Sequence, residues 1–215
     1  MKVDFQRALT APPGAQEVVL VRHGACEPPG PDGLIGGRSD PPLNERGRAE
    51  AAAAAARLAE EPVAAVFSTQ LRRAAETAVP IAAAHGLQPV ALEQLGEIYL
   101  GEWEGHGIHD RGSRGDPELA RVLREQRWDL IPGAEPGERF ASRVREGVEI
   151  VAEAAATAGD GRIAVAVTHS AVIAEFCRQA TGSEPFAFLH NSNGSLTRLF
   201  RMPDKRWILV SFNLA

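Results

Sequence analysis

The chain has 215 residues, of which 44% are hydrophobic and 24% charged, so it is long enough for one sizeable core and is not composed like a disordered polymer. Acidic and basic residues are interspersed, and the formal net charge of -5 offers no broad basic face for a run of nucleic-acid phosphates. These values predict a single domain over residues 1–215 and argue against nucleic acid as a partner.

The cysteines and the apolar runs limit further the class of protein that the sequence can encode. Cys26 and Cys177 lie far apart and neither belongs to a CxxC pair, which argues against a disulfide or a zinc site. Residues 1–14 lack the apolar core of a signal peptide, and nowhere do about 18 uncharged apolar residues run together. We therefore expect a cytoplasmic protein with no membrane partner and with a flexible lead over residues 1–15.

The first predicted strand covers residues 17–21 (EVVLV), whose β-branched apolar side chains are typical of a strand buried on both faces of a parallel sheet. It ends in an Arg-His-Gly triplet, residues 22–24. Gly and Pro then indicate a loop, after which Asn44 can cap a helix that runs to Leu58. The alanine run inside this helix favours it, since alanine has the highest helix propensity.

A second short strand is predicted over residues 63–67, followed by a helix over residues 71–85. Gly86 fits the C′ position that ends such a helix. A third strand is predicted over residues 89–92.

The segment of residues 101–137 resembles a lid or an insertion. We expect it to be irregular at first, with one helical stretch near residues 118–128 and then a turn containing Pro and Gly. Beyond it, helical spacing covers residues 139–156, and another buried strand covers residues 162–167 (RIAVAV). A helix to residue 181 follows this strand almost at once.

The last two predicted strands, residues 195–201 and 206–212, alternate in polarity around a turn, which predicts a β-hairpin at a sheet edge. Together with the recurring strand-helix units, they predict an α/β fold: a three-layer α/β/α sandwich with a mainly parallel central sheet and an edge hairpin. In such a fold the functional site lies at the carboxyl ends of the strands.

Polar side chains stand where the predicted strands stop: Arg22 and His23, then Ser68 with Arg72 and Arg73 beyond it, then Glu97, then His169. Guanidinium groups match phosphate oxygens, and the helix after His169 offers backbone amides to an anion. Nearby cations disfavour the imidazolium form of His23, which leaves its lone pair free to attack phosphorus. We therefore expect this site to bind a phosphoryl group.

Departure of an alkoxide needs a proton, which the carboxyl group of Glu97 could supply before it deprotonates the attacking water. Glu93, Glu102 and Glu104 are close in sequence and could present a carboxyl group instead. His169 and the arginines would stabilise the charge on the transferring phosphoryl group. This chemistry requires no metal and no cofactor.

These residues resemble the histidine phosphatase superfamily, also called the phosphoglycerate mutase-like family, over about residues 17–212. Four of its markers occur in order, and lesser similarities include Asn193 and Ser195. The four markers are the triplet of Arg22, His23 and Gly24; the series Ser68, Leu71, Arg73, Ala74 and Thr77; Glu97 before a Gly101, Glu102, Trp103, Glu104 and Gly105 turn; and His169 at its strand end.

The resemblance implies a phosphoglycerate mutase-like fold and a metal-independent phosphatase that hydrolyses a small phosphomonoester through a phosphohistidine on His23. It implies Glu97 and His169 as the other catalytic residues. It also implies that Arg73 rather than Arg72 joins Arg22, Gly24 and Ser170 in binding the substrate. It does not imply one substrate, because members include mutases and several kinds of phosphatase.

The chain departs from the family pattern in its first loop. Many members carry polar residues where Ala25 and Cys26 stand, and an asparagine that touches phosphate where Pro29 stands. Ser170 occupies a place often held by glycine. We expect the chemistry to persist with one phosphate contact fewer, and we interpret Cys26 as a pocket-wall residue rather than a nucleophile.

Other readings of the motifs stay open at this point. Glu102, His106, His109 and Asp110 could be metal ligands, but Gly105 and Gly107 interrupt any helix that would align them, so no metal is expected. Trp103 and Trp128 could either line the pocket or pack the lid. A phosphoglycerate mutase-type isomerase and a non-catalytic phospholigand-binding module are the alternative functions, and a homodimer is a possible assembly.

Overall fold

A central β-sheet forms the middle layer of the computed structural model, which describes residues 12–27, 36–105, 108–159 and 161–215. Most of the predicted flexible lead, residues 1–11, falls outside these ranges. Within them the strand order is β3-β2-β4-β1-β5-β6. The strands are β1 (Gln16–Arg22), β2 (Val63–Ser68), β3 (Val90–Ala91), β4 (Ile163–Thr168), β5 (Leu196–Arg201) and β6 (Trp207–Leu214).

The sheet is mainly parallel, as predicted, because β1, β2, β3 and β4 pair in parallel while β5 pairs antiparallel with β1 and β6. The predicted hairpin is therefore present, with β6 at the sheet edge. β3 is shorter than expected: its two residues, Val90 and Ala91, are exposed at the opposite edge, where little packing rewards a longer strand.

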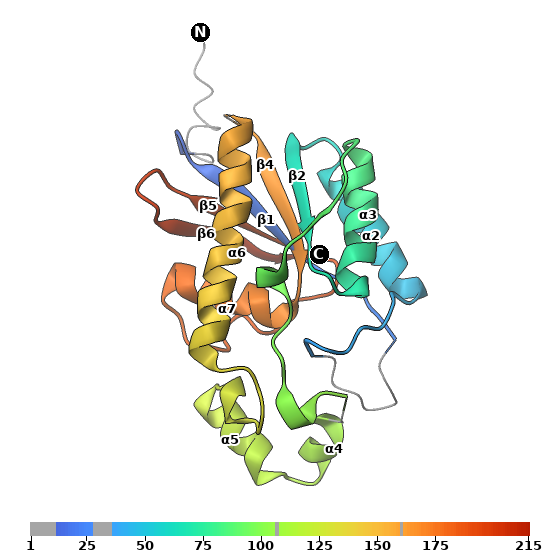
Figure 1. The fold of residues 1–215 in the computed structure, drawn as a ribbon, viewed down its shortest axis with the longest axis vertical. Helices are drawn as coiled ribbons and strands as arrows, with labels where there is room; N and C mark the ends of the chain where they lie inside the picture. Colours follow the sequence, from blue (N-terminus) through green and yellow to red (C-terminus); the bar gives the residue numbers. More distant parts are fainter. Residues whose placement is uncertain (1–11, 28–35, 106–107, 160) are drawn as a thin grey trace.

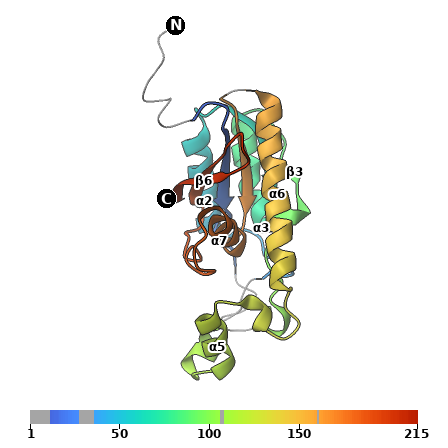
Figure 2. The same ribbon diagram turned by 90° about the vertical axis from the view of Figure 1, so that its left-hand side faces the viewer.

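Helices cover both faces of the sheet (Figures 1 and 2). Side chains alternate between faces along each strand, so Val18 and Leu20 of β1 pack with one set of helices while Val19 and Val21 pack with the other. The first face is covered by α6 (Gly137–Ala158) and α7 (Ser170–Thr181), and the second by α2 (Glu45–Leu58) and α3 (Arg72–Ala84).

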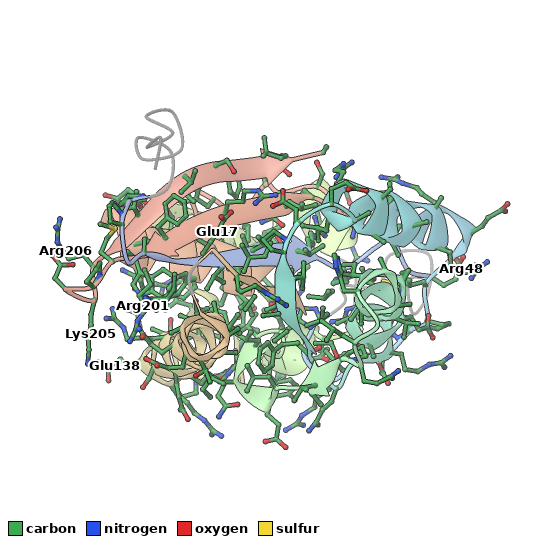
Figure 3. All side chains as sticks on the ribbon, turned by 90° about the horizontal axis from the view of Figure 1, so that it is seen from above. Glu17, Arg48, Glu138, Arg201, Lys205 and Arg206 are labelled. Carbon is green, nitrogen blue, oxygen red and sulfur yellow. The ribbon has the colours of Figure 1, made fainter. Side chains whose placement is uncertain are left out.

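α2 and α3 begin and end within one residue of their predicted bounds, whereas α6 is two residues longer than predicted at each end. Asn44 accepts a hydrogen bond from the amide of Gly47, which is the expected N-cap of α2 and contributes about 1 kcal/mol. α3 ends at Ala84, and Gly86 follows with a φ of 66°, the left-handed conformation that glycine adopts without strain. The side chains of Arg48 and Arg206 lie at the periphery of the molecule (Figure 3).

The segment of residues 101–137 extends beyond the carboxyl ends of the central strands (Figure 1). It contains α5 (Pro117–Glu125), where a helix was predicted, with Asp116 as its N-cap. It also contains α4 (Ile108–Ser113), where we expected an irregular chain. That expectation was wrong because α4 has six residues, too few to show helical periodicity, and includes a glycine.

Short 3₁₀ turns connect these elements: η1 (Glu93–Leu95), η2 (Gly101–Trp103) and η3 (Trp128–Leu130). Trp103 is fully buried among the core residues and Arg111 stacks on its ring, 4.5 Å from the centroid, so this tryptophan packs the segment onto the domain. Among the described residues, no helix combines the length and the apolar character that crossing a membrane requires.

Candidate active site

The residues that follow β1 and β4 meet at the carboxyl edge of the sheet. The amide of His23 donates to the carbonyl oxygen of Thr168, 2.9 Å away, so the two strand ends are joined directly. β5 runs antiparallel and begins at this edge, where Asn193 donates through Nδ2 to the carbonyl oxygen of His23 at 2.8 Å. We call the group of Arg22, His23, Arg73, Glu97 and His169 the strand-end site.

His23 is buried and its two ring nitrogens have different neighbours. Nδ1 lies 2.8 Å from the carbonyl oxygen of Gly24, which can only accept, while Nε2 lies 3.3 Å from the donor Nε of Arg73. These partners assign the proton to Nδ1 and the lone pair to Nε2. Burial, together with the charges of Arg73 and Arg22, lowers the pKa of His23 to about 3, so the imidazole is neutral at neutral pH.

Gly24 is pressed between two helices. Its amide donates to Oγ1 of Thr77 on α3 at 3.0 Å, and a Cβ atom added to Gly24 would overlap the carbonyl group of Gly47 on α2. A Cβ atom at Gly47 would in turn overlap the backbone of Ala25. The structure therefore gives Gly24 a packing reason for being glycine and commits its amide to Thr77.

The two neighbouring arginines at the start of α3 point in different directions. Arg73 is fully buried: besides its contact with His23, it donates to the carbonyl oxygens of Ser39 at 2.6 Å and Gly36 at 3.1 Å. Arg72 is exposed and pairs with Glu76 on its own helix, 3.3 Å away. Only Arg73 belongs to the strand-end site by position.

His169 lies beside His23, with ring centroids 5.1 Å apart. Its Nε2 atom shares a 2.9 Å hydrogen bond with Oγ1 of Thr69, a buried residue just after β2. Its Nδ1 atom is buried and has no hydrogen-bond partner among the described residues. Burial, followed by His23 and Arg73, lowers the pKa of His169 well below its usual value.

Arg22 shows a second unpartnered nitrogen. Nη1 donates to the carbonyl oxygen of Asn191, but Nε is buried without a hydrogen-bond partner in the described part of the chain. Leaving a buried donor unpaired costs about 1–3 kcal/mol. Two such nitrogens beside one nucleophile are an arrangement that a bound acceptor would relieve.

The four candidate carboxyl groups are separated by the structure. Glu97 lines the pocket beside His23, whereas Glu104 accepts from the amide of Ser39 at 2.6 Å, Glu93 accepts from Gln70 and Glu102 is exposed. Burial raises the pKa of Glu97, against the opposing effect of its 2.9 Å hydrogen bond from the amide of Ile98. A carboxyl group with a raised pKa can carry a proton at higher pH than an ordinary glutamic acid.

Arg143 of α6 holds the turn that carries Glu97. It donates to the carbonyl oxygens of Gln94 at 2.9 Å, Gly96 at 2.6 Å and Glu97 at 3.2 Å, and it forms two hydrogen bonds with the carboxylate of Glu135. Three backbone contacts and a bidentate ion pair fix the position of this turn relative to the sheet. Arg143 is therefore a positioning residue for Glu97.

A pocket of about 620 Å³ opens in front of these groups. Arg22, His23, Glu97 and Ser170 line it, while Arg73 and His169 lie buried behind His23. Cys26 also lines the pocket, and burial raises the pKa of its thiol, which disfavours the thiolate. The remaining lining residues are Ala25, Ile98, Leu100, Trp128, Ala171, Leu189, His190, Asn191 and Asn193.

Comparison with known protein families indicates the class of protein to which this chain belongs. A model of the histidine phosphatase superfamily, branch 1, matches residues 18–215. This chain belongs to that superfamily. The match covers β1 from Val18 onward, the other strands of the described sheet in full and every residue of the strand-end site.

Individual relatives of this chain carry several names. A metal-independent phosphoserine phosphatase of Arabidopsis thaliana is 31% identical over 92% of this chain and 81% of its own length. A bifunctional protein of Mycobacterium tuberculosis is 38% identical over 60% of this chain, which spans 35% of that longer protein. The structure of a mycobacterial glucosyl-3-phosphoglycerate phosphatase superposes with a TM-score of 0.78 at 27% identity, covering 94% of this chain and all of its own.

Some details of the site differ from what the sequence suggested. The hydroxyl group of Ser170 lines the pocket but donates to the carbonyl oxygen of Leu189 at 2.7 Å, so it is already paired. Trp128 lines the pocket, which Trp103 does not. Pro29 and His106 lie outside the described residues, and no group of three His, Cys, Asp or Glu side chains is placed to hold a metal within the described ranges.

Sequence reasoning missed two kinds of neighbour. Thr69 follows Ser68 at a strand end, and its position one residue beyond the strand was the available signal for its contact with His169. His190 and Asn191 precede β5, whose antiparallel direction places them at the site. Only the nearby Asn193 was singled out, because nothing in the sequence fixes which end of an edge hairpin faces a pocket.

Proposed function

We propose that this chain is a metal-independent phosphatase that hydrolyses a small phosphomonoester through a phosphohistidine on His23. The observation that carries this proposal is the neutral, buried His23, with its lone pair on Nε2, beside two unpartnered nitrogens on Arg22 and His169. A nucleophile with its lone pair on Nε2 and a buried guanidinium nitrogen without an acceptor fit a phosphoryl group, which supplies the electrophile and the acceptor oxygens.

In the first step, Nε2 of His23 attacks phosphorus and the bond between phosphorus and the ester oxygen breaks. Glu97, whose pKa is raised by burial, gives its proton to the departing oxygen, so the alcohol leaves neutral. The Nδ1 proton stays on the carbonyl oxygen of Gly24, which fixes the ring orientation through the transfer.

In the second step, the carboxylate of Glu97 accepts a proton from water, whose oxygen attacks phosphorus. The bond between phosphorus and Nε2 breaks, inorganic phosphate leaves, and His23 returns to its neutral form with Glu97 protonated again. Arg22, Arg73 and His169 would stabilise the charge on the equatorial oxygens during both transfers, which is mainly a matter of electrostatic positioning.

Names among the relatives support hydrolysis. The Arabidopsis relative and the mycobacterial structural neighbour are named as phosphatases, and structures of the latter were determined with VO3 and with inorganic phosphate. A relative named as a phosphoglycerate mutase-like protein is 31% identical over 86% of this chain, so a mutase is the alternative to test. A cytoplasmic location and a homodimer stay predictions.

The test is phosphate release from a panel of phosphomonoesters, including 3-phosphoglycerate, a generic aryl phosphate and ethyl phosphate, in the presence of a strong chelator. We expect wild-type protein to release phosphate and His23→Ala to release none. His85→Ala is the matched control, because His85 lies at the C-terminal end of α3 and lines no part of the pocket.

Alkaline quenching with an ester labelled in its phosphate would trap the intermediate, which should be stable in alkali, labile in acid and absent from His23→Ala. Release that survives His23→Ala would contradict the proposal. Isomerisation of 3-phosphoglycerate without release would favour the mutase, and binding without either would favour the phospholigand-binding module.

A further inference from the structure

A second compartment of about 430 Å³ adjoins the pocket in front of His23. The two hollows share four wall residues, Ile98, Trp128, Ala171 and Leu189, so they are neighbours along one wall. None of the residues of the strand-end site lines the second compartment. Its other lining residues are Gln126, Arg127, Asp129, Gly137, Glu138, Phe140, Ala141, Ala174, Glu175, Arg178, Pro185 and Phe186.

Aromatic and small apolar side chains form much of this compartment. Trp128 and Phe186 stack with ring centroids 4.7 Å apart and an interplanar angle of 32°. Phe140 and Ala174 are buried in the wall beneath them. Gln126 accepts a hydrogen bond from the amide of Phe186 at 2.9 Å, which anchors the loop that carries this ring. The surface is suited to a ring or a hydrocarbon group.

The charged residues of the compartment neutralise one another. Arg127 donates two hydrogen bonds to Asp129, at 3.0 and 2.9 Å, and Arg178 donates two to Glu175, both at 2.8 Å. Both guanidinium groups in the described lining are therefore committed to carboxylates. Glu138, in the first turn of α6, adds a third carboxylate to the lining, and the formal sum of two cations and three anions is negative.

This charge pattern contrasts with the neighbouring strand-end site, where Arg22 and Arg73 face the nucleophile. An anion bound at His23 has two arginines beside it. A second anionic group in the adjoining compartment would face a wall of net negative charge, in which both described arginines are already paired with carboxylates. Desolvating such a group without a partner is unfavourable.

We propose that the second compartment binds the alcohol part of the substrate, and that this alcohol is uncharged and largely apolar or aromatic. The proposal rests on the proposed function, because the phosphate at His23 places the remainder of the ester against the shared wall. It excludes esters whose alcohol carries a carboxylate or a second phosphate as preferred substrates, and so it also opposes a phosphoglycerate substrate.

The test compares three esters with primary alkoxide leaving groups: ethyl phosphate, 2-phenylethyl phosphate and 3-phosphonooxypropanoate. We expect kcat/KM for 2-phenylethyl phosphate to exceed that for ethyl phosphate about 10- to 100-fold, the range that an apolar group gains in a fitting pocket. We expect the carboxylate ester to fall below ethyl phosphate. Equal values for the first two esters, or a preference for the carboxylate, would overturn the proposal.

A matched pair of phenylalanines locates the effect. Phe186→Ala should reduce the ratio between the phenylethyl and ethyl esters at least about fivefold, because it removes one wall of the compartment. Phe188→Ala should leave the ratio unchanged, since Phe188 packs on Phe212, 5.0 Å between centroids, and lines neither hollow. Equal ratios in both variants, with unchanged melting temperatures, would contradict the assignment.

Binding separates this proposal from the proposed function. Calorimetry with 3-phenylpropylphosphonate and propylphosphonate, which cannot be hydrolysed, measures the same preference without turnover. Tighter binding of the phenyl compound by wild-type protein but not by Phe186→Ala would support the compartment even if no ester were hydrolysed. Equal affinities would sink it even if His23-dependent phosphate release were found.

Discussion

The strand-end site and the segment of residues 101–137 face the same pocket but are built differently. His23, Arg73 and His169 are buried, and their neighbours are backbone and side-chain groups of adjacent strands and of α3. The charged side chains of α5 and the turn that follows it form surface ion pairs within a few residues of one another. Rigid elements hold the groups that need exact placement, while the segment supplies part of the wall of the adjoining compartment.

This contrast predicts which property of the enzyme a substitution in each region should alter. Substitutions at the strand-end site should lower the rate of phosphoryl transfer for every ester, since all esters share the phosphate. Substitutions in the segment of residues 101–137 should change the ranking of esters or only the stability of the segment.

The largest effect is expected for His23→Ala, which removes the atom that bonds to phosphorus. We expect kcat to fall by at least about 10³-fold for all esters, with no labelled intermediate after alkaline quenching. Ester-dependent losses in this variant would break the division between the two regions.

Arg73→Ala should follow, with kcat/KM reduced about 10²- to 10³-fold because it removes a buried cation beside His23. Arg72→Ala is the control and should change kcat/KM less than about twofold, since its exposed pair with Glu76 contributes little. Similar losses in the two variants would show that Arg73 is not distinguished from Arg72 as the arginine of the strand-end site.

Glu97→Gln should lower kcat about 10²-fold for ethyl phosphate and much less for an aryl phosphate, whose leaving group needs no proton. Because the raised pKa keeps Glu97 protonated below it, wild-type activity should decline as pH rises through that pKa. The alkaline limb of the pH profile should be absent from Glu97→Gln. A limb that persists unchanged would assign the proton to another group.

Arg143→Lys should have a smaller effect, about tenfold in kcat for ethyl phosphate, because one ammonium group cannot span three carbonyl oxygens and Glu135. We also expect the alkaline limb to shift, which a purely structural loss would not cause. Arg145→Lys, on the exposed face of the same helix, should leave the pH profile unchanged.

The smallest effect is expected for Arg121→Ala in α5. Its ion pair with Glu125, 3.0 Å long, is largely exposed and of the i,i+4 type, so the free energy of unfolding should change by less than about 0.5 kcal/mol. The kcat/KM values for all three alkyl esters should stay within experimental error of the wild-type values, as chemical denaturation and initial rates would show.

Much of the fold followed from the sequence because its strong signals are local. The β-branched strands at residues 17–21 and 162–167, the N-cap Asn44 and Gly86 each act through neighbouring residues, and the structure contains the expected elements. α4 was missed because six residues carry no periodicity.

Within the site, strand ends and family markers were sufficient to collect Arg22, His23, Glu97 and His169. Hydrogen-bond partners that are distant in the sequence could not be predicted from it. Arg143 reaches the turn of Glu97 from 46 residues away, and Ser170 is paired with Leu189 across a loop. The committed amide of Gly24 likewise depends on Thr77 of a helix that packs above it.

The contact between Gly24 and Gly47 has a genetic consequence. A Cβ atom at position 24 would overlap the backbone of Gly47, and one at position 47 would overlap the backbone of Ala25, so the two positions should tolerate only glycine and should not rescue one another. A random screen for inactive variants would then return substitutions at Gly47, on a helix that lines no part of the pocket, alongside those at His23. A map of mutational sensitivity along this chain would therefore show Gly24 and Gly47, which support the loop after His23, as clearly as His23 itself.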